Sequence, residues 1–404
     1  MRCYRILFNV LKLSVTAQGL IYLDTRTYGT KESNMSDSKT YRVFVLNPGS
    51  TSTKLEYFEN EKSIKKDNIF HDSTILRNFD TINAQLYYRM EYVRKWLTEN
   101  NIDLTGIDAI VGRGGACYPV SSGTYEVDER LLNDVREAKG GVYHSSMLGI
   151  QMAKELHDEY GGRLLMVDPI VVDELQDVAR ITGVKGLYRT SATHALNLKA
   201  TAREHAKRTG VKYRDMNYIV CHIDGGITVT AHQKGRMIDA NDGSGGDGPF
   251  TPTRMGTMAV TDVIKFLFDK PIDEVRKLCQ STGGLSSWFG TSNSDTIHEM
   301  VEQGDPKATL IWNALIYQIT KLIGSMACVL HGQVDAIILT GGLMRFDDVY
   351  DGIKEACSWI APVSSYPGEL EHEAMRDGAL RVLRGEEEAK VYPGKPVFSG
   401  FDFD

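Results

Sequence analysis

Short alternating apolar runs on either side of a small polar turn are the clearest pattern in the chain. The apolar run at 43–46 enters the turn NPGSTSTK at 47–54, and a second alternating run follows at 55–58. This spacing predicts a strand, a tight turn and a second strand. The turn is rich in hydroxyls, and its backbone N–H groups and short donors suit an anion such as phosphate. An ordinary hairpin with a polar tip fits this stretch equally well when it is taken alone.

The same arrangement occurs again in the second half of the chain. An apolar run at 218–223 ends in the turn DGG at 224–226, and an alternating run follows at 227–231. A later pair also matches, because DAIVGRGG at 108–115 parallels DAIILTGG at 335–342. Two similar halves, each with a Gly-rich turn facing a shared cleft, are suited to clamping a nucleotide. Chance similarity among short apolar strands is the alternative.

Stretches with helical apolar spacing alternate with these strands. They lie at 87–100, 147–156, 260–269, 273–280 and 308–330. The last is a core helix, because polar residues at helical spacing interrupt its apolar run. The alternation predicts an α/β fold. Ligands in such folds bind beyond the carboxyl ends of the strands, where Asn47, Arg113, Asp168, Asp224 and Thr340 stand.

Two further stretches carry candidate chemistry. Residues 190–208 predict a helix that is capped by its first or second residue and holds His194 in its first turn. A lone histidine in a helix is more often structural than catalytic. Residues 243–248 match G-x-G-x-x-G, but no strand leads into them and prolines follow, so they predict a loop and not a dinucleotide fingerprint. Arg254 is the strong cation of this loop.

The length and composition indicate a globular protein of two or three domains. The chain has 404 residues, of which 42% are hydrophobic and 25% charged. Its net charge of −7 argues weakly against a nucleic-acid partner. The six cysteines form no C-x-x-C pair, which is typical of free thiols in a reducing compartment, so we expect a cytoplasmic protein. No apolar stretch approaches the roughly 20 residues of a membrane span.

The two ends of the chain differ from its middle. Residues 1–40 form an extension with a broken apolar region and a weak cleavage signal, so it is a poor signal peptide. We expect Met35 to be the physiological start, and a targeting role is the alternative. Residues 389–404 form a tail that contains Pro and Gly, and we expect it to be loosely ordered.

A series of motifs in order resembles butyrate kinase, a relative of acetate kinase in the superfamily of actin, hexokinase and the heat-shock chaperones. The motifs are VLNPGSTSTK, GRGG, HSSMLG, VDPI, HALNLKA, HIDGGI, GPFTPTR, ILTGGL and YPGELE. The resemblance implies a duplicated ββαβαβα fold with a cleft between domain I at 41–185 plus 366–388 and domain II at 186–365. It also implies a homodimer, with ATP and Mg²⁺, that reversibly converts butanoate to butanoyl phosphate and ADP.

The resemblance assigns roles to particular residues. The catalytic group is Arg113, Arg254, His194 and Asp168, in which the two planar guanidinium groups suit the charge of a transferring phosphoryl group. The ATP- and phosphate-binding group is Asn47, Ser50, Ser52, Lys54, Asp224, Gly225, Gly226, Thr340, Gly341 and Gly342. The metal is assigned to Asn47 and Glu371, with Glu369 as the alternative glutamate.

Two departures from the acetate kinases bear on the substrate. Thr190 stands where those enzymes carry a second histidine, and Gly114 and Gly115 replace bulkier residues. The glycines predict a roomier acyl pocket, to which His144 also belongs, for a four-carbon or branched acid. A kinase for acetate, propanoate or isobutanoate is the first alternative, since one or two methylenes change affinity by about 1–3 kcal/mol. A non-enzymatic chaperone or actin-like ATP-binding protein is less favoured, because no peptide-binding domain follows the core.

Overall fold

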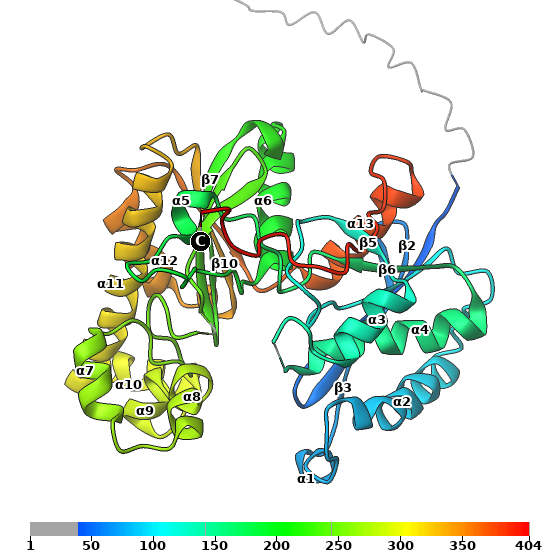
Figure 1. Ribbon diagram of the computed structural model, residues 1–404, viewed down its shortest axis with the longest axis horizontal. Coiled ribbons are helices and arrows are strands. Elements are labelled where there is room, and N and C mark those ends of the chain that lie inside the picture. The colour runs from blue at the N-terminus through cyan, green and yellow to red at the C-terminus, as the bar shows by residue number, and fades with distance from the viewer. Residues whose placement is uncertain (1–38, 142, 244, 404) are drawn as a thin grey trace, which may run out of the picture. The chain divides into compact units, whose positions relative to one another are not determined.

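Two mixed sheets organise the part of the chain that the structure, a computed structural model, describes: residues 39–141, 143–243 and 245–403 (Figure 1). The elements below all belong to one compact unit that begins at Thr40. The predicted start at Met35 and the extension before it lie outside the described residues.

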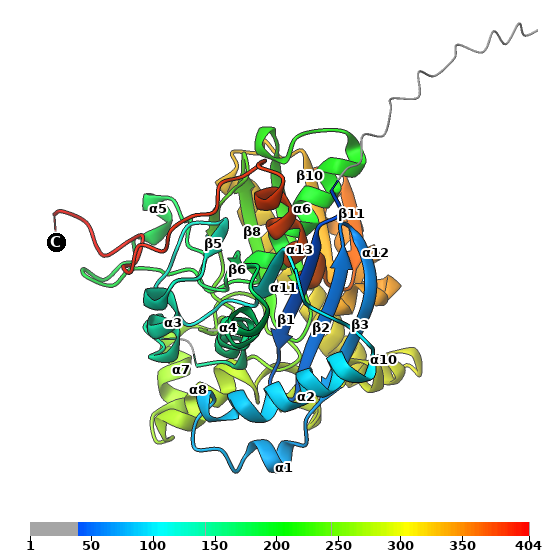
Figure 2. The ribbon, with the colours of Figure 1, turned by 90° about the vertical axis from the view of Figure 1, so that its right-hand side faces the viewer.

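The first sheet has the strand order β3-β2-β1-β4-β6-β5. Its strands are β1 (Arg42–Pro48), β2 (Ser52–Glu59), β3 (Lys62–Phe70), β4 (Ala109–Gly112), β5 (Thr124–Glu126) and β6 (Arg163–Val167). β1, β2 and β3 form an antiparallel meander (Figure 2), whereas β4 runs parallel to β1 and β6 runs parallel to β4. The helices α2 (Leu86–Glu99) and α4 (Leu148–Tyr160) pack on one face, and α13 (Glu371–Leu383) packs on the other.

The second sheet repeats this topology in the order β11-β10-β7-β8-β9. Its strands are β7 (Asn217–Ile223), β8 (Ile227–Gln233), β9 (Arg236–Ala240), β10 (Ala336–Gly341) and β11 (Val363–Pro367). β7, β8 and β9 form the antiparallel meander, and β10 runs parallel to β7 as β4 does to β1. The predicted duplicated α/β fold is therefore confirmed. Tyr366 and Pro367 still pair with β10, two residues beyond the expected end of domain II, and the domain boundaries themselves stay a prediction.

The alternation of side chains along β7 explains how the second sheet is covered on both faces. Ile219 and Cys221 belong to a core cluster with α11 (Pro306–Val329) and α12 (Asp347–Cys357). Tyr218 and Val220 point the other way, into a cluster with α6 (Ala195–Thr209). α6 also packs against α13 of the first sheet, so these two helices join the two halves.

The remaining helices are short. They are α1 (Ser73–Leu76), α3 (Glu129–Arg136), α5 (Asp177–Arg180), α7 (Val260–Leu267), α8 (Ile272–Gln280), α9 (Gly284–Phe289) and α10 (Ser294–Glu302), with 3₁₀ turns at Asn83–Gln85, Ser145–Met147, Tyr213–Asp215 and Gly342–Arg345. Figure 1 shows α7, α8, α9 and α10 grouped near one end of α11. Within the described ranges, no helix is both long and apolar enough to cross a membrane.

Two predictions about local structure need correction. The helix expected from Thr190 begins at Ala195, because the backbone N–H of Thr193 bonds to the carbonyl of Ile170 and keeps the preceding residues out of the helix. His194 therefore occupies the N-cap position and not the first turn. The glycine-rich stretch from 243 to 248 contains neither helix nor strand at its described positions, so the predicted loop is confirmed, but the expectation that no strand leads into it is wrong, because β9 ends at Ala240.

The expectation of a loosely ordered tail is wrong at its start. The backbone N–H of Lys390 donates to the carbonyl of Thr124 at 2.7 Å. Tyr392 is 2% exposed and joins an apolar cluster with Leu131 and Val135. Its hydroxyl donates to Asp134 Oδ2 at 2.8 Å. One aromatic side chain with a partner for its hydroxyl is enough to anchor a segment whose composition resembles a linker.

Candidate active site

A buried arginine holds the turn between β1 and β2. Arg89 of α2 is fully buried, and its guanidinium donates to the carbonyl oxygens of Gly49, Ser50 and Ser52 at 2.9–3.1 Å. Burial lowers the pKa of Arg89 to about 10. No carboxylate of the described residues forms an ion pair with it, so its positive charge acts on the turn and favours an anion there. The sequence analysis missed Arg89, whose signal is one cation among the apolar positions of an amphipathic helix.

Arg113 follows β4 and meets a carboxylate from the first turn of α13. Its Nη2 lies 2.9 Å from Glu371 Oε1, and Asn47 Nδ2 at the end of β1 donates to Glu371 Oε2 at 2.6 Å. Burial alone would raise the pKa of Glu371, but Arg113 and Asn47 more than offset this and hold it below its ordinary value. The motifs around these residues therefore do converge. Each Glu371 oxygen already has a partner, Arg113 by an ion pair and Asn47 by a hydrogen bond, and the predicted metal role of Glu371 stays a prediction.

A pocket of about 430 Å³ adjoins this pair, and Asn47, Lys54, Asp224, Glu369 and Glu371 contribute to its lining. Lys54 Nζ lies 3.7 Å from Glu369 Oε2. Burial and the nearby charges of Glu371 and Asp224 raise the pKa of Glu369 from its ordinary 4.5 to about 7. The carboxylates of this pocket therefore lie so close together that ionising all of them at once is unfavourable.

The two glycine loops of the second half pack around Asp224 and Arg254. Asp224 accepts hydrogen bonds from the backbone N–H groups of Gly225 at 2.7 Å and Gly342 at 2.8 Å. A Cβ atom at Gly342 would lie 2.5 Å from Asp224 Oδ2, and one at Gly226 would lie 2.5 Å from Arg254 Nη1. A side chain at either position would therefore displace Asp224 or Arg254 from its present place. Gly341, with φ of 106°, adopts a conformation that other residues rarely take.

Two neutral histidines lie near both arginines. The rings of His194 and His222 stack with centroids 3.9 Å apart, and His194 Nδ1 lies 2.8 Å from Thr228 Oγ1. Burial, followed by His222, Arg254 and Arg113, lowers the pKa of His194 well below its ordinary value. Arg113 Nη1 and Arg254 Nε are buried and have no hydrogen-bond partner among the described residues. These donors are available to a bound anion.

Gly114 and Gly115 make room for neighbouring side chains. A Cβ atom at Gly114 would lie 2.3 Å from Met166 Sδ, and one at Gly115 would lie 2.7 Å from Ser146 Oγ. A roomier acyl pocket therefore does not follow from these two glycines, because Met166 and Ser146 occupy the space. His144 Nδ1 accepts from the backbone N–H of Ser146 at 3.1 Å, and burial and Arg113 lower the pKa of His144.

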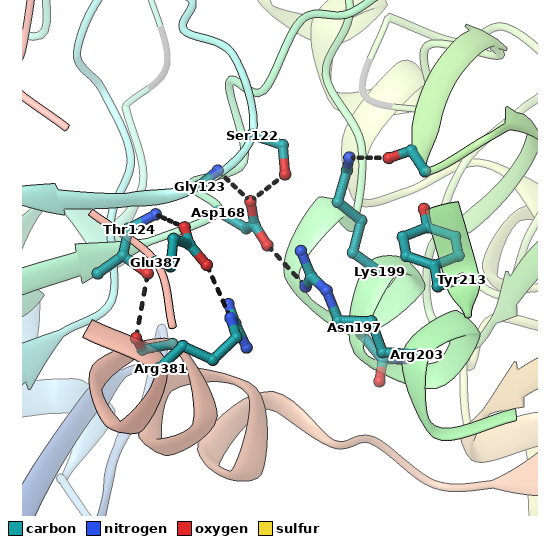
Figure 3. Close-up of polar contacts among 12 residues, drawn as sticks. Ser122, Gly123, Thr124, Asp168, Asn197, Lys199, Arg203, Tyr213, Arg381 and Glu387 are labelled. Atoms are coloured by element: carbon teal, nitrogen blue, oxygen red, sulfur yellow. Dashed lines mark hydrogen bonds and ion pairs between the residues drawn. The ribbon is translucent and has the colours of Figure 1, made fainter. Parts of the chain in front are cut away.

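Asp168 belongs to a different group of contacts (Figure 3). It follows β6, is fully buried and has a φ of 35°. Its Oδ1 accepts from Ser122 Oγ at 2.6 Å and from the N–H of Gly123 at 2.8 Å, and its Oδ2 lies 3.3 Å from Arg203 Nη1 on α6. Within the described residues no contact joins Asp168 to Arg113. Its contacts tie β6 to α6, and its catalytic role stays a prediction.

The sequence analysis also missed a buried amide at the centre of the site. Asn197 lies three residues after His194 on α6 and is fully buried. Its amide contacts His222, Thr340 and the backbone N–H of Leu370. Thr340 is itself buried and donates to the carbonyl of Gly368 at 2.8 Å. The available signal was the i, i+3 spacing of two polar residues on one helix face.

Three solved structures with a similar fold are acetate or propionate kinases. Acetate kinase from Porphyromonas gingivalis matches at a TM-score of 0.69 and 17% identity, over 85% of this chain and 100% of that chain. A propionate kinase from Francisella tularensis matches at 0.66 and 16%, over 84% and 98%. Acetate kinase from Entamoeba histolytica matches at 0.65 and 17%, over 86% and 99%. At these identities the likeness shows the two-domain, actin-like fold alone.

The sequence comparison matches part of the chain to one family. Residues 183–346 match the model of the acetokinase family. The matched segment includes His194, Asn197, His222, Asp224 and Arg254. The match spans the second half of the fold, from before α6 to the turn after β10.

Proposed function

We propose that the protein is a kinase that transfers the γ-phosphoryl group of ATP to a short-chain carboxylic acid, with butanoate as the preferred acid. The observation that carries the proposal is a pair of arginines from the two halves of the fold, of which Arg113 is buried and Arg254 is half-buried. Arg113 and Arg254 both lower the pKa of His194, so their charges act on one place, and each has a buried N–H without a partner in the described structure. Such donors suit the charge that develops on a transferring phosphoryl group.

The reaction needs no strong base. A carboxylic acid is ionised near neutral pH, so its oxygen attacks the γ-phosphorus directly, an acyl O–P bond forms, and the bond to the bridging oxygen of ADP breaks. The guanidinium groups of Arg113 and Arg254 bind and orient the charged oxygens. His194 is held neutral by burial and by the arginines, so it contributes hydrogen bonding and no proton. The turn held by Arg89 offers backbone N–H groups to the nucleotide phosphates, whereas the N–H groups of Gly225 and Gly342 hold Asp224 in place.

The carboxylates of the pocket fit Mg²⁺. Asp224 and Glu369 supply hard oxygen donors, and the raised pKa of Glu369 shows a repulsion that a dication would relieve. When bound, Mg²⁺ would neutralise charge on the ATP phosphates. The earlier assignment to Asn47 and Glu371 places the metal in the same pocket, which all four residues line.

The choice of acid is the finer part of the proposal. It is supported by the ordered motifs from VLNPGSTSTK to YPGELE, since the packing around Gly114 and Gly115 gives no reason for a larger pocket. Acetate, propanoate and isobutanoate are the competing acids. The homodimer and the cytoplasmic location stay predictions of the same resemblance.

The test is formation of an acyl phosphate, trapped with hydroxylamine, from ATP, Mg²⁺ and a panel of acids with two to five carbons. We expect activity that peaks at butanoate. A peak at acetate would keep the reaction and reject the preferred acid. ATP binding without activity on any acid would reject the kinase proposal.

A matched pair of variants tests the arginine argument. Arg254→Gln removes one phosphoryl-binding cation and is expected to lower kcat by about 10²–10³. Arg276→Gln makes the same change on α8 at a side chain that is 67% exposed and is expected to leave kcat unchanged. Equal activity of the two variants would contradict the role given to Arg254.

A further inference from the structure

The cluster of His222, Asp224 and Glu369 has the geometry of a three-ligand metal site. One ligand atom from each residue lies within 4.8 Å of the others. With an available imidazole nitrogen, such a set suits Zn²⁺, whereas two carboxylates alone suit Mg²⁺. Which metal the cluster accepts therefore depends on whether His222 Nε2, the nitrogen that lies 3.7 Å from Glu369 Oε1, carries a hydrogen.

The orientation of the Asn197 amide is fixed by two independent contacts. Its Oδ1 accepts from the backbone N–H of Leu370 at 2.9 Å, which can only donate. Its Nδ2 lies 3.4 Å from Thr340 Oγ1, whose hydrogen is already donated to the carbonyl of Gly368 at 2.8 Å. Thr340 can therefore only accept from Asn197, and both contacts place the NH₂ group on the same side.

This orientation determines the hydrogen on the histidine. Asn197 Nδ2 lies 2.9 Å from His222 Nδ1, and an NH₂ group can only donate, so Nδ1 must accept. Because Nδ1 accepts, it carries no hydrogen, and an imidazole ring with an unprotonated Nδ1 is neutral and holds a single N–H. That hydrogen must be on Nε2, the nitrogen that faces the carboxylates.

We propose that Asn197 is a positioning residue that holds His222 in the tautomer with hydrogen on Nε2, and so makes the cluster a two-carboxylate site for Mg²⁺ and excludes Zn²⁺ coordination by the ring. The selection of Mg²⁺ over Zn²⁺ rests on the proposed function, which requires Mg²⁺. The tautomer of His222 does not depend on that function. The other tautomer would place Nδ1–H against the NH₂ group of Asn197. Rotating the amide would then place NH₂ against the N–H of Leu370, so neither arrangement satisfies all the groups.

Replacing the Asn197 amide with a carboxylate should favour the other tautomer of His222. Asn197→Asp keeps an acceptor for the N–H of Leu370 and gives His222 Nδ1 an acceptor as well. The ring then carries its hydrogen on Nδ1, and the Nε2 lone pair faces Asp224 and Glu369. We expect this variant to bind Zn²⁺ at least tenfold more tightly than the wild-type chain, with all three side chains as ligands.

The first experiment reads the tautomer of His222 in the metal-free full chain, by two-bond ¹H–¹⁵N correlation spectra of protein labelled at histidine. The resonance is assigned by its loss in His222→Gln. We expect a protonated Nε2 and an unprotonated Nδ1, and the reverse pattern would overturn the proposal. Because neither ATP nor an acid is present, this result is independent of kinase activity and separates failure of the inference from failure of the proposed function.

The second experiment measures Zn²⁺ affinity by competition with a chromogenic chelator. Asn197→Asp should gain affinity and lose the gain when His222→Gln is added, whereas Asn133→Asp, the same change at an exposed position of α3, should gain none. Equal Zn²⁺ affinity of Asn197→Asp and Asn133→Asp would overturn the proposal. If Asn197→Asp does not fold, the wild-type chain tests the proposal instead. A shift of the His222 Nε2 resonance on addition of equimolar Zn²⁺ would contradict the proposal.

Discussion

Glu369 should make the metal-free protein less stable at high pH. Burial and the charges of Glu371 and Asp224 raise its pKa from 4.5 to about 7 in the folded state. A raised pKa favours the protonated acid in the fold, so this stability is present below pH 4.5 and is lost as the pH rises through 7. Because the side chain is 30% exposed, we take the loss by pH 8 as about 2–3 kcal/mol.

Glu369→Gln removes the charge and should recover this loss. In the presence of EDTA, the variant is expected to exceed the wild-type chain in free energy of unfolding by about 2 kcal/mol at pH 8, with little difference at pH 5. The contact with Lys54, whose side chain is 45% exposed, offsets less than about 1 kcal/mol of the gain. Urea unfolding at the two pH values measures both differences. Glu355→Gln, at an exposed position of α12, provides the matched control.

Mg²⁺ should make the wild-type chain more stable than Glu369→Gln, because Mg²⁺ binds the ionised carboxylate. With a pKa of about 7, Glu369 is mostly protonated at pH 6 and mostly ionised at pH 8, so Mg²⁺ affinity should rise roughly tenfold between them. The variant should show neither this rise nor the same stabilisation by Mg²⁺. A change in stability of Glu369→Gln that is equal at pH 5 and pH 8 would refute the account of the crowded pocket.

Three further substitutions test buried polar contacts of the fold. Arg89→Met removes the donors to the carbonyls of the β1–β2 turn, so amide hydrogen exchange at 49–52 should accelerate at least tenfold, and unchanged protection would contradict the role of Arg89. Asp173→Asn leaves the 5%-exposed Arg180 without its ion-pair partner and should lower the free energy of unfolding by about 3–5 kcal/mol in urea titrations; a loss under 1 kcal/mol would show that the pair is dispensable. Tyr392→Phe removes one hydroxyl hydrogen bond and should cost about 1 kcal/mol and speed proteolysis of the tail, whereas an unchanged cleavage rate would indicate that the tail is not anchored there.

The local patterns of the sequence were sufficient for the duplicated fold. Alternating runs around small polar turns place β1–β2 and β7–β8, and the later Gly pairs place the ends of β4 and β10. These features are local, since they depend on side-chain period and on turn chemistry, so they can be recognised without knowledge of the partners in space. The same reasoning brought Asn47, Arg113 and Asp224 to one end of the strands.

The sequence did not reveal contacts between residues that lie far apart in the chain. Glu371 forms an ion pair with Arg113, more than 250 positions away, and Asn197 contacts both His222 and Leu370. The spacing of these residues in the sequence does not indicate that they are partners. Similarly, Gly114 suggested an open pocket until Met166 was found to fill the space. Period and composition determine which face of an element is buried, but the identity of a buried partner, and with it pKa and tautomer, depends on how separate elements pack.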